Sequence, residues 1–67
     1  MKLYRYLTGP DDASFCHRVS AALNQGWELY GNPTLTYDIE RQRVITGQAI
    51  VKEVAGTYSP DLDLSAQ

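Results

Sequence analysis

Cys16 and His17 are the only pair in this 67-residue chain that suggests nucleophilic catalysis. A cysteine nucleophile needs a base within hydrogen-bonding distance of its sulfur. The two residues are neighbours in a segment with helical periodicity, where adjacent side chains point about 100° apart and do not face each other. Cys16 also falls on the apolar stripe of that segment, so we expect a buried core cysteine and a solvated histidine. The pair therefore predicts no catalytic residue and no enzyme.

Five tyrosines and one tryptophan suggest a second kind of chemistry, the stacking of a ligand ring. Arg5 lies between Tyr4 and Tyr6 in the sequence but on the opposite face of a strand, and its guanidinium could pair with an anionic group. Arg41 and Arg43 would join such a site if two subunits brought them together. These five residues form a speculative site for a nucleotide-like anion at a subunit interface. The plainer interpretation places some of the aromatic rings in the core and leaves the arginines solvated.

A helix that starts near Asp11 and Asp12 would offer its N-terminus to an anion. The two carboxylates occupy that position and would repel a phosphate, so we interpret the segment as a capped turn with Asp11 as the N-cap. One cysteine cannot form an internal disulfide. One cysteine and one histidine cannot complete a structural zinc site, and we expect neither a metal nor a cofactor.

The composition describes one small domain, because 43% of its 67 residues are apolar and 21% are charged. Six basic against eight acidic residues give a net charge of −2, which excludes the basic surface of a nucleic-acid-binding domain. No apolar run approaches the roughly 18 residues of a membrane span. The first residues lack the apolar stretch of a signal peptide, so we expect a cytoplasmic protein with no membrane partner.

The chain begins with a predicted strand over residues 3–8, which stops at Gly9 and Pro10. A helix of about 14 residues, an ordinary length, follows Asp11. Gly26 supplies the left-handed position that ends it. The helix carries one narrow apolar stripe, made of Phe15, Cys16, Val19, Ala22 and Leu23.

Residues 27–37 alternate as a second strand, with Trp27 and Leu29 on the core side and a bulge at residues 31–33. Residues 38–42 form a hairpin loop, and residues 43–54 form the longest strand. On one face of that strand, Gly47 and Ala49 are small enough for the helix to approach closely.

These elements predict an α+β fold, a small β-α-β-β domain over residues 1–54. A right-handed crossover makes the first two strands parallel, and the third returns between them, so the sheet order is 1-3-2 with the helix on one face. Residues 55–67 are acidic and without periodicity, which indicates a flexible C-terminal tail.

One helix leaves the other face of a three-stranded sheet uncovered. We assign to that face, as an interface, the side chains Leu3, Leu7, Val44 and Ile50. Burying each would yield about 1.5–3 kcal/mol, which predicts a homodimer or higher homo-oligomer. An error of one residue in the register of the first strand would place Tyr4 and Tyr6 on the uncovered face instead of the two leucines. The uncovered face is apolar in both cases, so the expectation of self-association holds.

Three runs of the sequence, TGPDD, SFCHRVSAALNQGWELYGNPTLTYD and TGQAIVKEV, carry a family resemblance. The chain resembles short bacterial and phage proteins grouped as a domain of unknown function, DUF1737, over residues 2–54. The resemblance implies the compact α+β domain and assigns no activity and no site residue. We therefore expect a non-enzymatic interaction or assembly module that self-associates through its open sheet face and can bind a protein partner. The alternative is a protein that binds or sequesters a small ligand.

Overall fold

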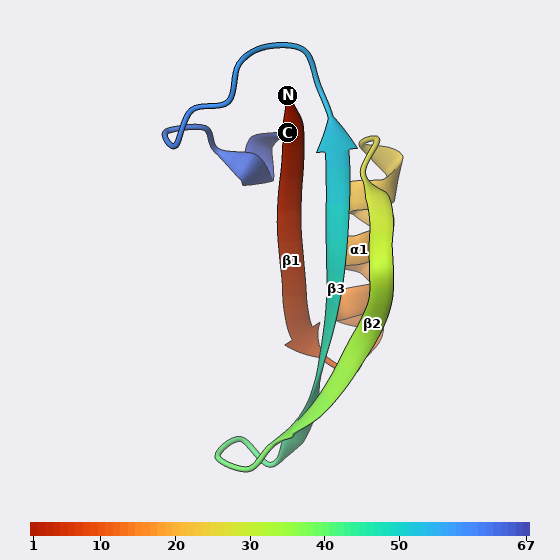
Figure 1. Ribbon diagram of the computed structural model, residues 1–67. Helices are drawn as coiled ribbons and strands as arrows, with labels where there is room; N and C mark the ends of the chain where they lie inside the picture. Colours follow the sequence, from red (N-terminus) through yellow and green to blue (C-terminus); the bar gives the residue numbers. More distant parts are fainter.

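The computed structural model describes residues 1–67 and contains one sheet, one α-helix and one short 3-10 helix (Figure 1). The elements in chain order are β1 (Lys2–Pro10), α1 (Ala13–Asn24), β2 (Glu28–Asp38), β3 (Arg43–Glu53) and η1 (Leu64–Ala66). The strand order is β1-β3-β2, and β3 is antiparallel to both neighbours. This confirms the predicted β-α-β-β fold with the third strand in the centre. Figure 1 shows α1 behind the sheet and the front face without a helix.

The start of α1 corrects the expected cap. Asp12, not Asp11, is the N-cap, because its carboxylate accepts a hydrogen bond from the backbone N–H of Ser14 at 2.9 Å. The backbone N–H of Asp11 instead donates to the carbonyl of Val44 at 3.2 Å, which ties Asp11 to the sheet. The helix therefore begins after Asp12 and has 12 residues rather than the expected 14 or so.

The end of α1 confirms the role of Gly26, which adopts φ +96°. Its N–H donates to the carbonyl of Leu23 at 3.2 Å, and the N–H of Trp27 donates to the carbonyl of Ala22 at 3.1 Å. These two bonds form a Schellman motif, the usual left-handed ending of a helix. The motif places Trp27 directly against the end of the helix, where Trp27 and Ala22 share the core.

The core lies between α1 and the sheet. It consists of Leu3, Leu7, Phe15, Ala22, Trp27 and Ile50. Leu3, Leu7 and Ile50 are only 2%, 4% and 0% exposed, so their expected place on the uncovered face is wrong. Each face of β1 carries large apolar side chains, Leu3 and Leu7 on one and Tyr4 and Tyr6 on the other. The alternation alone therefore does not determine which face packs against the helix. The leucines face inward because a tyrosine can keep its hydroxyl in water, whereas a leucine has no polar group to solvate.

Several other side chains differ from the expected core. Cys16 is exposed, so the buried-cysteine interpretation is wrong, because the helix turns Phe15 rather than Cys16 toward the sheet. Val44 shares the face of Ile50, six residues away on the same strand, but it lies beyond the last pair of β1 with β3, Pro10 with Ile45, and there it is exposed. Leu29 pairs with Ile50 on the helix side as predicted, yet it too is exposed.

The β2–β3 hairpin confirms the predicted bulge. The pairing of β2 with β3 shifts between Tyr30 and Thr34, and Gly31 adopts φ +71° there. At the tip, the carboxylate of Asp38 accepts hydrogen bonds from the N–H groups of Glu40 and Arg41, at 3.1 and 3.3 Å. The hairpin extends past the end of β1 and gives the molecule a length of 42 Å (Figure 1).

Exchanging Trp27 for alanine tests which side of the sheet is the core. Trp27→Ala removes a fully buried ring and should lower the free energy of unfolding by about 3–5 kcal/mol. Tyr30→Ala, three residues later on the uncovered side, should cost far less, since that ring is already largely in water. Urea denaturation of both variants measures the difference. Equal losses would contradict the assignment of the faces.

The cap predicts a pH dependence. Hydrogen bonds from the hydroxyl and the backbone N–H of Ser14 lower the pKa of Asp12 below its ordinary value of 3.8. Because the pKa is lower in the folded state, the ionised cap stabilises the fold fully above the ordinary value of 3.8. This stabilisation is lost as the pH falls through the folded-state pKa. Asp12→Ala should therefore lower the Tm at neutral pH, and the gap to the wild type should close below about pH 3.8. Melting curves over a pH series check this, with Asp11→Ala as the control that shows a smaller gap at neutral pH.

Candidate functional site

The uncovered sheet face carries three tyrosines. Tyr4, Tyr6 and Tyr30 expose 53%, 46% and 60% of their surface. Tyr4 pairs with Val51, while Tyr6 and Tyr30 pair with Ala49 from its two sides. Directly opposed residues share a face of the sheet, so these side chains stand together on the side away from α1. We call this surface the tyrosine face and define it by Tyr4, Tyr6, Tyr30, Ile45 and Val51.

Small residues of β3 form the floor of the tyrosine face. The hydroxyl of Tyr6 lies 2.6 Å from the hydroxyl of Thr34 on β2, so the ring reaches across the central strand at Gly47. A Cβ atom on Gly47 would lie 2.6 Å from the Tyr6 oxygen and 2.8 Å from the Thr34 oxygen. Gly47 and Ala49 therefore make room for the tyrosines. Our expectation that they let the helix approach is wrong, because they lie on the opposite face.

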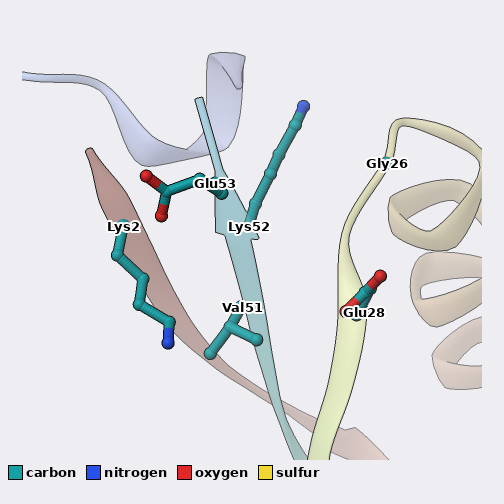
Figure 2. A pocket seen from close by; sticks show the side chains of 6 residues that line it. All are labelled: Lys2, Gly26, Glu28, Val51, Lys52 and Glu53. Carbon is teal, nitrogen blue, oxygen red and sulfur yellow. The ribbon is translucent and has the colours of Figure 1, made fainter. Parts of the chain in front are cut away.

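One end of the tyrosine face opens into a hollow of about 400 Å³ (Figure 2). Figure 2 shows Lys2 and Glu28 on the two outer strands with Val51 between them, and Lys52 pointing away from Val51. The full lining is Lys2, Gly26, Glu28, Val51, Lys52 and Glu53. Two lysines and two glutamates favour neither an anion nor a cation. The hollow is therefore a polar rim of mixed charge and not a phosphate site.

The five residues of the speculative anion site do not meet within one chain. The Arg5 guanidinium lies on the helix side, 5.7 Å from the centre of the Trp27 ring, and so opposite Tyr4 and Tyr6 as expected. Arg41 is at the hairpin tip, where its Nε lies 3.7 Å from a carboxylate oxygen of Asp38. Arg43 starts β3 at the same end of the molecule. A shared site between subunits stays a prediction.

Cys16 and His17 are both exposed, and neither side chain makes a hydrogen bond. No group of three or more histidine, cysteine, aspartate or glutamate side chains is placed to hold a metal ion. No helix is long and apolar enough to cross a membrane.

Tyr30 is the tyrosine-face residue that sequence reasoning missed. Its signal was present in the alternation of the second strand, because a core position for Trp27 and Leu29 turns Glu28 and Tyr30 outward.

The fold and this surface define a class: a small α+β domain with one sheet face covered by a helix and the other face open. The chain belongs to the family described as a domain of unknown function (DUF1737), which matches residues 1–53. This confirms the family resemblance, and the matched region includes α1 and all three strands. No curated protein and no solved structure matches the chain.

The packing of Tyr6 over Gly47 can be tested by a double-mutant cycle. Gly47→Ala places a methyl group against Tyr6 and should lower the free energy of unfolding by about 1–3 kcal/mol, as overpacking does. In a Tyr6→Ala background most of that space is free, so the same substitution should cost less. Chemical denaturation of the four proteins measures the coupling. An unchanged cost in both backgrounds would show that the ring does not lie over Gly47.

Proposed function

We propose that the protein is a non-enzymatic interaction module that self-associates by packing the tyrosine faces of two copies against each other. The observation that carries the proposal is the open sheet face, on which three partly exposed tyrosines surround a floor of small residues. The proposal keeps the cytoplasmic location and the bacterial or phage origin expected from the sequence. A further protein partner is compatible with it, on the surfaces that the dimer leaves free.

The chemistry of the face supports this proposal. Tyrosine is enriched in protein interfaces and in their energetic centres, because a ring buries a large apolar area and keeps a hydroxyl for hydrogen bonding. Ala49 and Gly47 are buried beneath the rings, so a partner would meet the exposed parts of the tyrosines themselves. Val51 and Ile45 add partly buried apolar surface beside the rings.

The size of the face supports a reversible dimer. β1 has 9 residues and the sheet has three strands, so at about 3.4 Å per residue and 4.8 Å between strands the projected area is roughly 400 Å². Exposed apolar patches of a few hundred Å² mark interaction sites on small proteins. A standard interface buries about 800 Å² on each partner, so a face of about half that area supports only a weak, transient association. Two sheets packed in this way lie about 10 Å apart.

The charges at the rim favour a second copy as the occupant. A symmetric dimer places the same patch on both sides of the interface. Lys2 lies opposite Glu53 in the sheet, and Glu28 lies across Val51 from them. Because the rim holds both signs of charge, a lysine of one copy can meet a glutamate of the other.

Sedimentation velocity over micromolar to millimolar concentrations tests the dimer. We expect the wild type to approach twice the mass of one chain as its concentration rises. The variant Tyr4→Lys/Tyr30→Lys places two cations on the face and should remain monomeric with an unchanged far-UV CD spectrum.

Tyr37→Lys is the matched control. Tyr37 is also exposed, but it pairs with Val44 on the other face of the hairpin, so this variant should associate like the wild type. A wild type that stays monomeric throughout, or a double variant that associates as tightly as the control, would overturn the proposal.

A further inference from the structure

Trp27 lies between two cations on the helix side of the sheet. The Arg5 guanidinium and the Lys52 ammonium are 5.7 and 5.8 Å from the centre of its ring. Trp27 is only 2% exposed, and its indole N–H is buried without a hydrogen-bond partner. A buried donor without an acceptor is rare and costly. We call Arg5, Trp27 and Lys52 the cationic clamp.

The C-terminal segment, residues 57–67, contacts Lys52 of the clamp and carries a carboxylate within electrostatic range of Arg5. The Lys52 ammonium donates a hydrogen bond to the backbone oxygen of Gln67. Hydrogen bonds from Ser65 are the main cause that lowers the pKa of Asp63, and the positive charge of Arg5 lowers it further without forming an ion pair. The charge of Asp63 is therefore of the sign that the basic side of the domain attracts.

The same segment places leucines on apolar surface. Leu62 and Leu64 are partly buried and pack against the core. Leu64 and Tyr58 line a hollow of about 290 Å³ together with Leu3 of β1. Figure 1 shows the segment leaving β3, passing the end of β1 and returning beside it, so that the two ends of the chain lie close together.

Backbone hydrogen bonds do not join this segment to the domain. Its backbone–backbone bonds run from Leu62 to Ser59, from Ala66 to Asp63 and from Gln67 to Leu64, all inside the segment. A strand of a sheet is held by a ladder of such bonds, whereas a bound peptide can be held by side chains alone. The segment is therefore held as a ligand is held, by two leucines packed against the core and by the bond from Lys52 to the backbone oxygen of Gln67. It also lies outside the family match, which ends at residue 53 and contains the whole clamp.

We propose that the clamp and Leu3 form a binding site for an acidic, leucine-containing peptide, and that residues 61–67, which begin with Asp-Leu-Asp-Leu, occupy it as an internal strap. The strap must leave before another segment of the same chemistry can bind. The clamp and Leu3 lie on the face opposite the tyrosine face, and only Tyr4 of that face lines the hollow beside Leu64, so this proposal does not rest on self-association.

Trp27 is the only tryptophan of the chain, which makes its fluorescence a direct probe of the strap. In the full-length variant Leu62→Asp/Leu64→Asp, we expect a red-shifted emission and stronger acrylamide quenching, with the far-UV CD spectrum retained. Ser59→Asp/Ala66→Asp adds two carboxylates to exposed positions of the same segment and should leave both signals unchanged. An emission that does not respond to the leucine substitutions would overturn the strap.

A peptide of residues 57–67 then tests the site itself. Added to the released full-length variant, it should reverse the emission shift with a saturable titration, and the peptide with both leucines changed to aspartate should not. Release without rebinding would show that the segment is only a cover of the core, and would overturn the binding site.

If the double variant loses its far-UV CD signal, Asp63→Arg replaces it. Asp63→Arg keeps both leucines and reverses the charge that acts on Arg5. The strap is overturned if the tryptophan emission does not shift, and the binding site is overturned if the peptide does not reverse the shift. Tyr30→Lys changes the tyrosine face away from the hollow that Tyr4 and Leu64 line, leaves the clamp intact and should show wild-type tryptophan emission, so the two proposals fail separately.

Discussion

The inward position of Trp27 is the constraint on which the rest of the structure depends. The Schellman bonds at Gly26 leave no freedom between the last turn of α1 and the start of β2, so the indole enters the core directly after the helix. Alternation then turns Glu28 and Tyr30 to the other side. Because Ala49 of β3 pairs with Tyr30 on one side and with Tyr6 on the other, Ala49 and Tyr6 lie on the same open face as Tyr30. One helix ending therefore decides which face of the whole sheet is open.

The open face is built differently from the core. The helix side uses leucine and isoleucine, which have no polar group to solvate, together with the large ring of Trp27, whereas the outer side uses tyrosine above glycine and alanine. A tyrosine is stable half in water and half against apolar surface, so the face is tolerated in one chain and still gains from burial. The Tyr6–Thr34 hydrogen bond also links the two outer strands across β3. Such a surface is the kind that the proposed dimer would bury.

The sequence predicted the elements and the topology well, because these depend on local signals: Gly26 at the helix end, residues 31–33 at the bulge and a polar hairpin tip. It predicted the wrong face for Leu3, Leu7 and Ile50, because a pattern of period two with large apolar residues in both phases does not define inside and outside. Asp11 and Asp12 are equivalent as caps until the bond from Asp11 to Val44 separates them. The contacts of residues 57–67 depend on side chains distant in sequence. The flexibility of the C-terminal tail, residues 55–67, remains a prediction.

The two surfaces meet in one strand. Val51 belongs to the tyrosine face, and its neighbour Lys52 belongs to the cationic clamp, so successive residues of β3 serve opposite sides of the sheet. A slip of β3 by one residue would exchange them and damage both surfaces at once. The pairing of β3 with both neighbours and the inward Trp27 oppose such a slip. A domain with so small a core can therefore hold two distinct surfaces, because the feature that stabilises the fold also keeps them apart.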